Sequence, residues 1–516
     1  MGLVPSSESA ASSPGMAGHA VSGTGWSAFQ GIVNKLATMA SMLVVARFLS
    51  PEDYGASALV QGAGTFLVLL PPLVMGDVLI AHERHLDSVR LVARRLVFLS
   101  AGASSVVILL SLPVFLAIYP NFPGGTLTAL MLTFAVRPLA DAACVVPLSR
   151  LRACLRFRAI AAIDGGVQLA ATVATVVMAA SGAEALSLAM PQALASVARA
   201  VLYFTNSRDS PASTEPPVGR RASAWSRRLG KQFVTAALAQ HSHTFISNLP
   251  MLALGHFSTK NETGTYTFAF YLSVQATFVI SYQVGLVLQP IFVKLRHDPV
   301  RQSHGFLRVI AAVGALAVPL SLLQAVLAEP LLKVLFGERW LHAAPTFAAL
   351  SIGQAFFFAV APTMAMLRAQ GRFRLLLTWQ ILQLVVSVGA YAVAAAHGAL
   401  MVALVDSITW TIAVPIAAWT CVWGRGPSVT DVLRPVFAPW LTALPIAALA
   451  WYASWVLSEY GMPGAILAVV VVGPLAGAAS LAAIRFSQPS TYAELAPLLG
   501  RAIGGASRFA VRMLTR

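Results

Sequence analysis

Charged side chains inside long apolar segments are the residues of this sequence best suited to chemistry. Lys35 lies nine residues after Trp26 and twelve before Arg47, and Arg137 lies eleven residues from each end of a later apolar segment. A charge at the centre of a membrane-spanning helix costs about 2.5–3.5 kcal/mol on insertion scales, so it faces protein or water. Two such cations predict a site for a phosphate or diphosphate, because Arg offers a planar fork of donors and Lys a point charge.

A structural role is the alternative for these cations. Asp141 follows Arg137 at i+4 and could pair with it on one helix face, while a neighbouring helix could satisfy Lys35. Arg199 lies six residues from the end of its apolar segment, where a long side chain can reach the membrane interface. We include Arg199 with Lys35 and Arg137 as a candidate ligand of the anion.

Neutral polar groups in the second half of the chain, and three acids, are further candidates. The neutral groups could bind sugar hydroxyls, or they could hold helices together, which is the commoner use of such residues in membranes. They are Gln240, His243, Asn248, Gln275 and Gln283. The acids Asp141, Asp164 and Asp406 are candidate carriers of a coupling proton or cation.

The composition places these residues in a polytopic membrane protein. Of the 516 residues 57% are hydrophobic and 10% are charged, which leaves more apolar area than a soluble fold could bury. A helix of about 20 residues crosses a hydrocarbon core of ~30 Å. We predict an all-α fold with about 14 transmembrane helices, at 26–49, 56–80, 94–118, 126–148, 158–181, 184–205, 231–255, 265–290, 307–336, 342–367, 375–396, 398–423, 435–457 and 463–484.

The distribution of charge predicts the orientation of these helices. A net charge of +16 would indicate nucleic acid as the partner of a soluble protein, but here most of the 35 Lys and Arg residues fall in alternate loops. Loops rich in Lys and Arg remain in the cytoplasm. We therefore expect both termini to be cytoplasmic, and we expect membrane lipids and no nucleic acid as partners.

The sequence lacks the standard catalytic and nucleotide-binding motifs, and its three cysteines form no CxxC pair. His82 and His85 lie in a charged loop, and His241 and His243 would fall on different faces of a helix, so neither pair has the geometry of a metal site. We expect no catalytic residue, no metal and no cofactor.

Two short sequences recur and indicate an internal duplication. Residues 151–158 read LRACLRFR and residues 367–374 read LRAQGRFR, identical at six of eight positions, and residues 48–55 match residues 257–264 at a similar offset. Six predicted helices separate the copies, so both have the same orientation in the membrane. Parallel repeats of this kind, two six-helix lobes around a central cavity, are typical of alternating-access transporters.

The duplication and the composition together define the expected domains. We predict a disordered cytoplasmic tail at 1–25, a six-helix lobe at 26–205, a cytoplasmic linker at 206–230, a second six-helix lobe at 231–423, two additional transmembrane helices at 424–485 and a basic amphipathic cytoplasmic tail at 486–516. In that last tail Arg501, Arg508, Arg512 and Arg516 share one helical face, which suits an anionic membrane surface, although a solvated tail would also carry such charges.

Four stretches at helix ends resemble the oligosaccharide flippases of the polysaccharide transporter family, in the multidrug/oligosaccharidyl-lipid/polysaccharide exporter superfamily. They are ARFLSPEDYG at 46–55, RACLRFRAIAAID at 152–164, QPIFVKLRHD at 289–298 and LFGERWLHAAPTFAALSI at 335–352. The likeness covers roughly residues 26–425, and the remaining ends resemble the family only in hydropathy.

This resemblance implies a transporter and not an enzyme. It implies that the protein moves undecaprenyl-diphosphate-linked oligosaccharide repeat units across the bacterial inner membrane for surface or exopolysaccharide biosynthesis, through a cationic central cavity. A polysaccharide polymerase and a co-polymerase are then candidate partners. The resemblance supplies no strict site motif, so the assignment of Lys35 and Arg137 rests on their charge and depth.

Two other functions are compatible with a fold of this kind. A cation-coupled small-molecule exporter of the same superfamily would need a membrane acid and would gain little from two cations at the midplane. A membrane-embedded polysaccharide polymerase or transferase would need a sizeable outer loop for its active site, whereas the predicted outer turns contain only a handful of residues.

Overall fold

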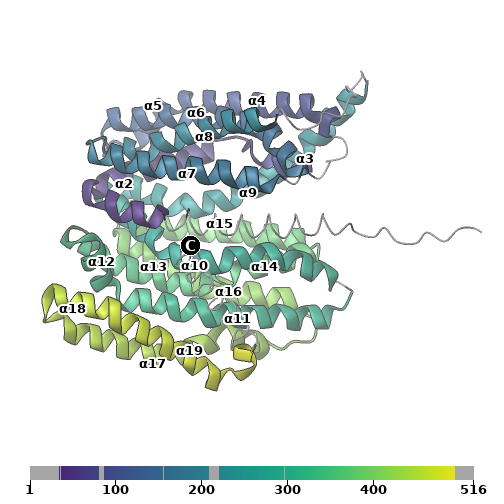
Figure 1. Ribbon diagram of the computed structural model, residues 1–516. Coiled ribbons are helices and arrows are strands. Elements are labelled where there is room, and N and C mark those ends of the chain that lie inside the picture. Colours follow the sequence, from purple (N-terminus) through teal and green to yellow (C-terminus); the bar gives the residue numbers. More distant parts are fainter. Residues whose placement is uncertain are drawn as a thin grey trace, which may run out of the picture. The chain divides into compact units, whose positions relative to one another are not determined.

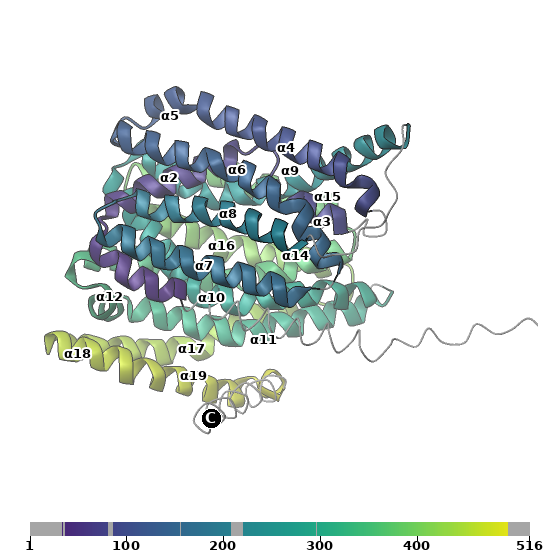
Figure 2. The same cartoon turned by 45° about the horizontal axis from the view of Figure 1, so that its top comes forward.

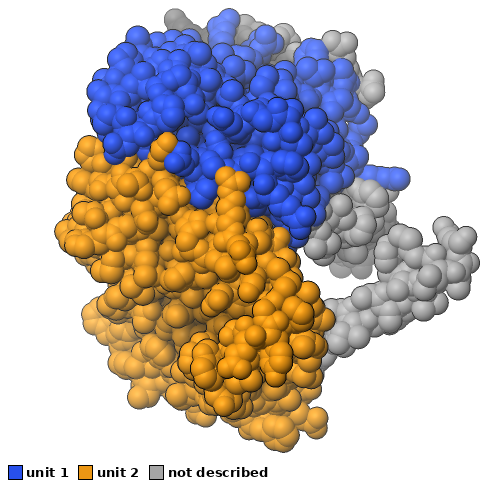
Figure 3. All heavy atoms as spheres, turned by 90° about the vertical axis from the view of Figure 1, so that its left-hand side faces the viewer, with its two compact units in different colours: residues 1–245 blue, residues 246–516 orange. Residues whose placement is uncertain are grey.

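The structure is a computed structural model that describes residues 34, 37–80, 86–154, 156–207, 220–295 and 297–493. Every regular element in these ranges is a helix, as predicted, and the chain divides into two compact units, residues 1–245 and 246–516 (Figure 3). Among the described residues, ten helices are long and apolar enough to cross a membrane. The fold is therefore an all-α polytopic membrane fold, while the predicted total of 14 spans stays a prediction.

Unit 1 consists of long helices that lie side by side in Figures 1 and 2. After a short apolar helix at Ala37–Phe48 they are α2 Pro51–Leu67, α3 Val74–Ile80, α4 Leu86–Leu110, α5 Leu112–Ile118, α6 Gly124–Ala153, α7 Phe157–Ala180, α8 Leu186–Ser207 and the first part of α9 Arg220–Phe257. Helix α6 packs against α2, α3, α4 and α8, and α7 packs against α8. Helix α6 therefore has neighbours on several sides, and its charged residues Arg137 and Asp141 are half-buried.

Unit 2 begins within α9. Its elements are α10 Lys260–Lys294, α11 Pro299–Val326, α12 Ala328–Phe336, a 3₁₀ helix Glu338–Ala343, α13 Ala344–Phe357, α14 Val360–Ala369, α15 Phe373–Ala395, α16 Ala399–Val422, α17 Val429–Ser458, α18 Gly461–Leu467, a π-helical turn Ala468–Val472 and α19 Gly473–Ser487. Helix α11 packs against α10, α13 and α17, around a core that includes Phe292, Phe306 and Phe358. Helices α17 and α19 cover the outer side of α11 (Figure 1).

Both copies of the repeat make the same local contacts, which supports the duplication. Ser50 and Thr259 cap the N-termini of α2 and α10, each accepting a hydrogen bond from the backbone N–H three residues later. Arg156 in the first arginine loop donates to the carbonyl of Asn206 at 3.1 Å, in the last turn of α8. Arg372 in the second loop donates to the carbonyl of Thr420 at 2.7 Å, in the last turn of α16.

Several helix boundaries differ from the sequence predictions for identifiable reasons. The predicted span 56–80 is two helices, because the Pro71–Pro72 pair cannot continue a helix and the chain bends between α2 and α3. Helix α9 begins at Arg220 and not at Lys231, so the end of the predicted 206–230 linker is helical; no proline follows Pro217 there to prevent it. Residues 208–219, the tail at 1–25 and the four arginines of the last tail lie outside the described residues.

Candidate functional site

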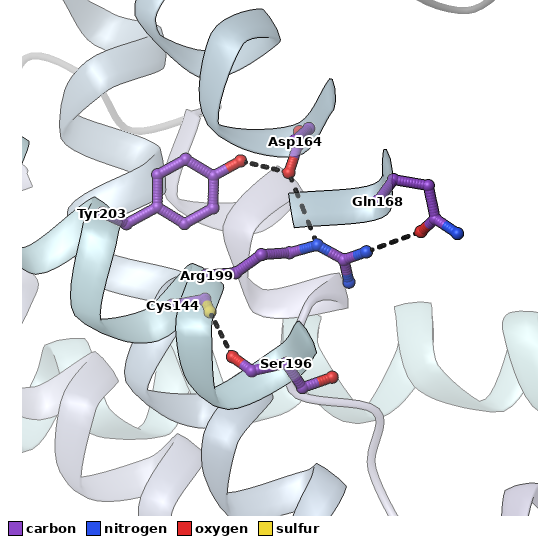
Figure 4. Close-up of polar contacts among 6 residues, drawn as sticks. All are labelled: Cys144, Asp164, Gln168, Ser196, Arg199 and Tyr203. Atoms are coloured by element: carbon purple, nitrogen blue, oxygen red, sulfur yellow. Dashed lines mark hydrogen bonds and ion pairs between the residues drawn. The ribbon is translucent and has the colours of Figure 1, made fainter. Parts of the chain in front are cut away.

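Four polar side chains of α7 and α8 form a connected cluster in unit 1 (Figure 4). The Nη2 of Arg199 donates to the Oε1 of Gln168 at 2.9 Å, and its Nε lies 3.8 Å from the Oδ1 of Asp164. The hydroxyl of Tyr203 donates to the same Asp164 oxygen at 2.6 Å. The carboxylate of Asp164 therefore pairs with the guanidinium of Arg199 and accepts a hydrogen bond from the phenol of Tyr203.

Helical spacing explains why these four residues meet. Asp164 and Gln168 lie four residues apart on one face of α7, and Arg199 and Tyr203 lie four residues apart on one face of α8. The two helices pack against each other, which brings the two polar faces together. The Arg199 side chain is 26% exposed and that of Asp164 is 41% exposed, so the cluster is accessible from one side.

Arg137 on α6 stands near this cluster without an ion pair. Its Cζ lies 5.1 Å from the centroid of the Phe134 ring, and its Nε is buried without a hydrogen-bond partner among the described residues. Although Asp141 is also described, the two residues form no ion pair within 4.0 Å. Pro138 follows directly and has no N–H for the carbonyl of Phe134, so the helix is weakened next to the cation. The guanidinium of Arg137 retains unused donors.

Asp141 links Arg137 to the cluster electrostatically. It lies within range of Arg137, Arg199 and Ser196, and the backbone carbonyl of Ser196 accepts a weak hydrogen bond from the Sγ of Cys144 at 3.9 Å. Among the described residues, the two cations Arg137 and Arg199 therefore lie near two acids, Asp141 and Asp164. The expected excess of positive charge depends on Lys35, which lies outside the described residues, so the cationic cavity stays a prediction.

Unit 2 contains a different acidic cluster. Asp406 on α16 is 6% exposed and accepts a hydrogen bond of 2.5 Å from the hydroxyl of Tyr391 on α15. Tyr266 on α10 lies within electrostatic range of this pair, and its hydroxyl is buried without a partner among the described residues. No cation of the described residues lies within 4.0 Å of Asp406.

The predicted sugar ligands are only partly described. The side chains of Gln240, His243 and Gln283 lie outside the description, although the backbones of all three are helical. Asn248 is half-buried on α9, and the Oε1 of Gln275 on α10 is buried with no partner in the described structure. Their contact with a sugar stays a prediction.

Three contributors escaped the sequence analysis: Gln168, Tyr203 and Tyr391. The first two had a usable signal, because each lies four residues from a charged residue already singled out on the same helix. Tyr391 had none, because only the packing of α15 against α16 brings it to Asp406. The described residues contain no group of three or more His, Cys, Asp or Glu side chains that could hold a metal ion.

Two solved structures resemble this fold. The lipid II flippase MurJ in an inward closed conformation matches with a TM-score of 0.66 and 12% sequence identity, over 89% of this chain and 98% of that one. An inward-facing multidrug resistance transporter of the MATE family, in the MOP superfamily, matches with a TM-score of 0.53 and 16% identity, over 78% of this chain and 96% of that one. At these identities the likeness shows the fold alone.

Two curated proteins match part of the sequence. The succinoglycan biosynthesis transport protein ExoT of Rhizobium meliloti (strain 1021) is 26% identical over 227 residues, which are 43% of this chain and 45% of ExoT. The teichuronic acid biosynthesis protein TuaB of Bacillus subtilis (strain 168) is 23% identical over 217 residues, 42% of this chain and 45% of TuaB. The chain thus spans about half the length of the curated relatives it matches.

A family model gives the broader match. The model described as polysaccharide biosynthesis protein matches residues 44–345, more than half of the chain. This range contains most of unit 1, including Arg137 on α6 and the polar cluster of α7 and α8. It extends through α12 of unit 2. The chain belongs to the polysaccharide biosynthesis protein family.

Proposed function

We propose that this protein is a flippase that moves undecaprenyl-diphosphate-linked oligosaccharide repeat units from the cytoplasmic to the outer leaflet of the bacterial inner membrane. Membership of a polysaccharide biosynthesis family supports a role in building a polymer. The all-α fold, shared with a lipid flippase and a MATE transporter, supports transport and not bond chemistry. The duplication predicted from the sequence, with two bundles of the same orientation, supports alternating access as the mechanism.

The observation that carries the proposal is the guanidinium of Arg137, which forms no ion pair and has a buried, unpartnered Nε among the residues that the structure describes. An unpaired cation in a membrane helix is costly unless a ligand or water compensates it. A diphosphate would accept hydrogen bonds from Arg137 in a bidentate way, and Lys35 and Arg199 would add charge around it. The prenyl chain would remain in the lipid while the head group crosses.

Flipping by the purified protein tests this directly. Vesicles reconstituted with the full chain receive a fluorescent undecaprenyl-diphosphate-linked oligosaccharide, and a membrane-impermeant quencher measures how much lipid reaches the other leaflet. We expect Arg137→Ala and Lys35→Ala to slow flipping by roughly tenfold or more, as loss of a charge-assisted contact predicts. Arg95→Ala is the matched control, because Arg95 is an exposed cation of α4.

Complementation of a deletion strain provides the second measurement. Both variants should reach wild-type levels in the membrane and yet reduce export of the polymer. Full complementation by Arg137→Ala and Lys35→Ala would refute the anion site.

A cation-coupled small-molecule exporter is the second candidate, favoured by the MATE-like fold and by the buried Asp406, which has no cation within 4.0 Å among the described residues. Efflux of a fluorescent cationic drug separates the two functions. Drug extrusion that depends on this protein, with polysaccharide export unchanged in its absence, would establish the exporter and end the flippase proposal.

A further inference from the structure

Unit 2 contains a polar pocket of ≈ 500 Å³ at the end of its helices that carries the second arginine loop. The turn between α10 and α11, the first turn of α11, the end of α14 and the turn after α16 enclose it. Its polar lining consists of His297, Gln302, Arg368, Gln370 and Arg425. It lies far along the chain from the polar cluster of unit 1 and shares no residue with it.

The two arginines of the pocket lie beside tight turns: Arg368 is in the last turn of α14, and Arg425 follows the end of α16. Gly371, two residues after the end of α14, has φ +69°, and Gly424, directly before Arg425, has φ +72°. Both values lie in the left-handed region, which glycine adopts without strain. Helix α11 begins at Pro299 in the pocket wall, and the N-terminus of a long helix adds partial positive charge.

Buried amides fix one of these arginines in place. Gln302 is 1% exposed; its Oε1 accepts from the Nη1 of Arg425 at 3.2 Å, and its Nε2 donates to the carbonyl of Phe292 at 2.8 Å. Gln370 donates to the carbonyl of Cys421 at 3.0 Å, which leaves its own Oε1 buried without a partner in the described structure. The pocket therefore presents a guanidinium, that of Arg425, whose orientation is fixed by a buried amide.

The lining of the pocket contains two arginines and no acid. Asp298 lies between the lining residues His297 and Pro299, and its carboxylate accepts the backbone N–H of Arg301 at 3.0 Å as the cap of α11. Arg368 is exposed and makes no hydrogen bond or ion pair within the described part of the chain. Burial lowers the pKa of Arg425, and the neighbouring guanidinium of Arg372 lowers it further. An anion bound here would relieve this repulsion.

We propose that this pocket binds a phosphate group, held by Arg368 and Arg425. A phosphate diester in an anionic lipid head group and a free phosphate share this chemistry. Basic pockets at the cytoplasmic ends of transmembrane helices commonly receive lipid head groups. This site is separate from the proposed substrate site, and the inference does not depend on the proposed function.

Calorimetric titration of the full chain in detergent tests the proposal with two probes. The probes are short-chain dihexanoyl phosphatidylglycerol, which carries a phosphate diester and hydroxyls, and inorganic phosphate. We expect binding by the wild type, and roughly tenfold weaker binding by Arg368→Gln and by Arg425→Gln, because each loses a charge-assisted contact. Arg374→Gln is the matched control, since Arg374 is an exposed cation of the same loop that does not line the pocket.

The outcomes separate the two sources of phosphate. Binding of the lipid with loss in both pocket variants assigns a lipid head group, whereas binding of inorganic phosphate alone with the same losses assigns a free phosphate. Arg368→Gln removes no contact within the described structure, so it remains informative even if Arg425→Gln destabilises the fold. The proposal is overturned if neither probe binds, or if Arg374→Gln weakens binding as much as the pocket variants.

Discussion

Asp164 in unit 1 and Asp406 in unit 2 each lie in the helical hairpin that follows an arginine loop. Each is the eighth residue of its helix, α7 or α16, and each accepts a hydrogen bond from a tyrosine of the partner helix. Helix α7 begins at the arginine loop, whereas α16 begins at the opposite end of its hairpin, after the turn at Gly398. The two acids therefore lie at opposite ends of equivalent hairpins.

The two acids have the same kind of hydrogen-bond partner, a tyrosine, but the charge and the burial around them differ. Asp164 is partly exposed and lies 3.8 Å from the Nε of Arg199, while Asp406 is buried with hydroxyl groups and has no cation among the described residues. A carboxylate beside a cation holds that cation in position. A buried carboxyl group without a cation is the kind that carries a proton or an ion in membrane transporters. We infer that unit 1 binds the anion and unit 2 couples the ion.

Asp406→Asn should have the largest effect, because asparagine keeps the hydrogen bond from Tyr391 but cannot carry a proton. We expect the rate of flipping driven by a pH gradient to fall by more than roughly tenfold, and the response to the gradient to disappear. Asp164→Asn should retain the gradient response. Flipping rates in reconstituted vesicles, measured with and without an imposed gradient, check both. If flipping by Asp406→Asn still responds to the pH gradient, the inference that unit 2 couples the ion is wrong.

Arg199→Gln, alone and together with Asp164→Asn, tests the role of the unit 1 acid. The single variant leaves Asp164 without its cation, and the loss of stability should stay at about 1 kcal/mol because the pair is partly exposed. The double variant should recover that stability but not the flipping rate, because a cation for the diphosphate is still missing. Thermal unfolding in detergent and the vesicle assay measure the two quantities. Recovery of flipping in the double variant would show that Arg199 is only structural.

Tyrosine-to-phenylalanine substitutions compare the two hydrogen bonds themselves. Tyr391→Phe leaves Asp406 buried with one partner fewer and should cost about 1–3 kcal/mol of stability. Tyr203→Phe should cost less, about 0.5–1.5 kcal/mol, because Arg199 and solvent still reach Asp164. Unfolding by heat, followed by circular dichroism, gives the ranking. If the two variants lose the same amount of stability, the deeper burial of Asp406 does not make its tyrosine hydrogen bond more important than that of Asp164.

Hydropathy predicted much of this fold because membrane helices are apolar along their whole length. It could not predict where such a helix breaks: the span 56–80 is apolar throughout, yet Pro71 and Pro72 divide it. The N-caps Ser50 and Thr259 stand in matching positions of the repeat, a signal that the sequence analysis did not use. Local chemistry therefore fixes the helix ends that composition leaves open.

The candidate site was less predictable, because its contacts run between helices. The sequence identified Arg137, Arg199 and Asp164 as unusual charges, and it offered a pair between Arg137 and Asp141 as the structural alternative to a functional role. The structure instead pairs Arg199 with Asp164 across α7 and α8, 35 residues apart. Spacing along one helix indicates which residues share a face, but the partner helix decides which of them meet.

The smallest expected effect concerns the two arginine caps, which bind equivalent carbonyls in the two units. Arg156→Gln and Arg372→Gln should each lower stability by about 0.5–1 kcal/mol, because each removes a cation from a helix C-terminus. The cost of the substitution should depend on a neighbouring charge only in unit 2. Arg372 repels Arg425, so removal of Arg372 also relieves that repulsion. In an Arg425→Gln background the cost of Arg372→Gln should therefore rise, while the cost of Arg156→Gln should not change. Thermal unfolding of these single and double variants measures the coupling, and a cost of Arg372→Gln that is independent of residue 425 would show that the two guanidinium groups do not interact.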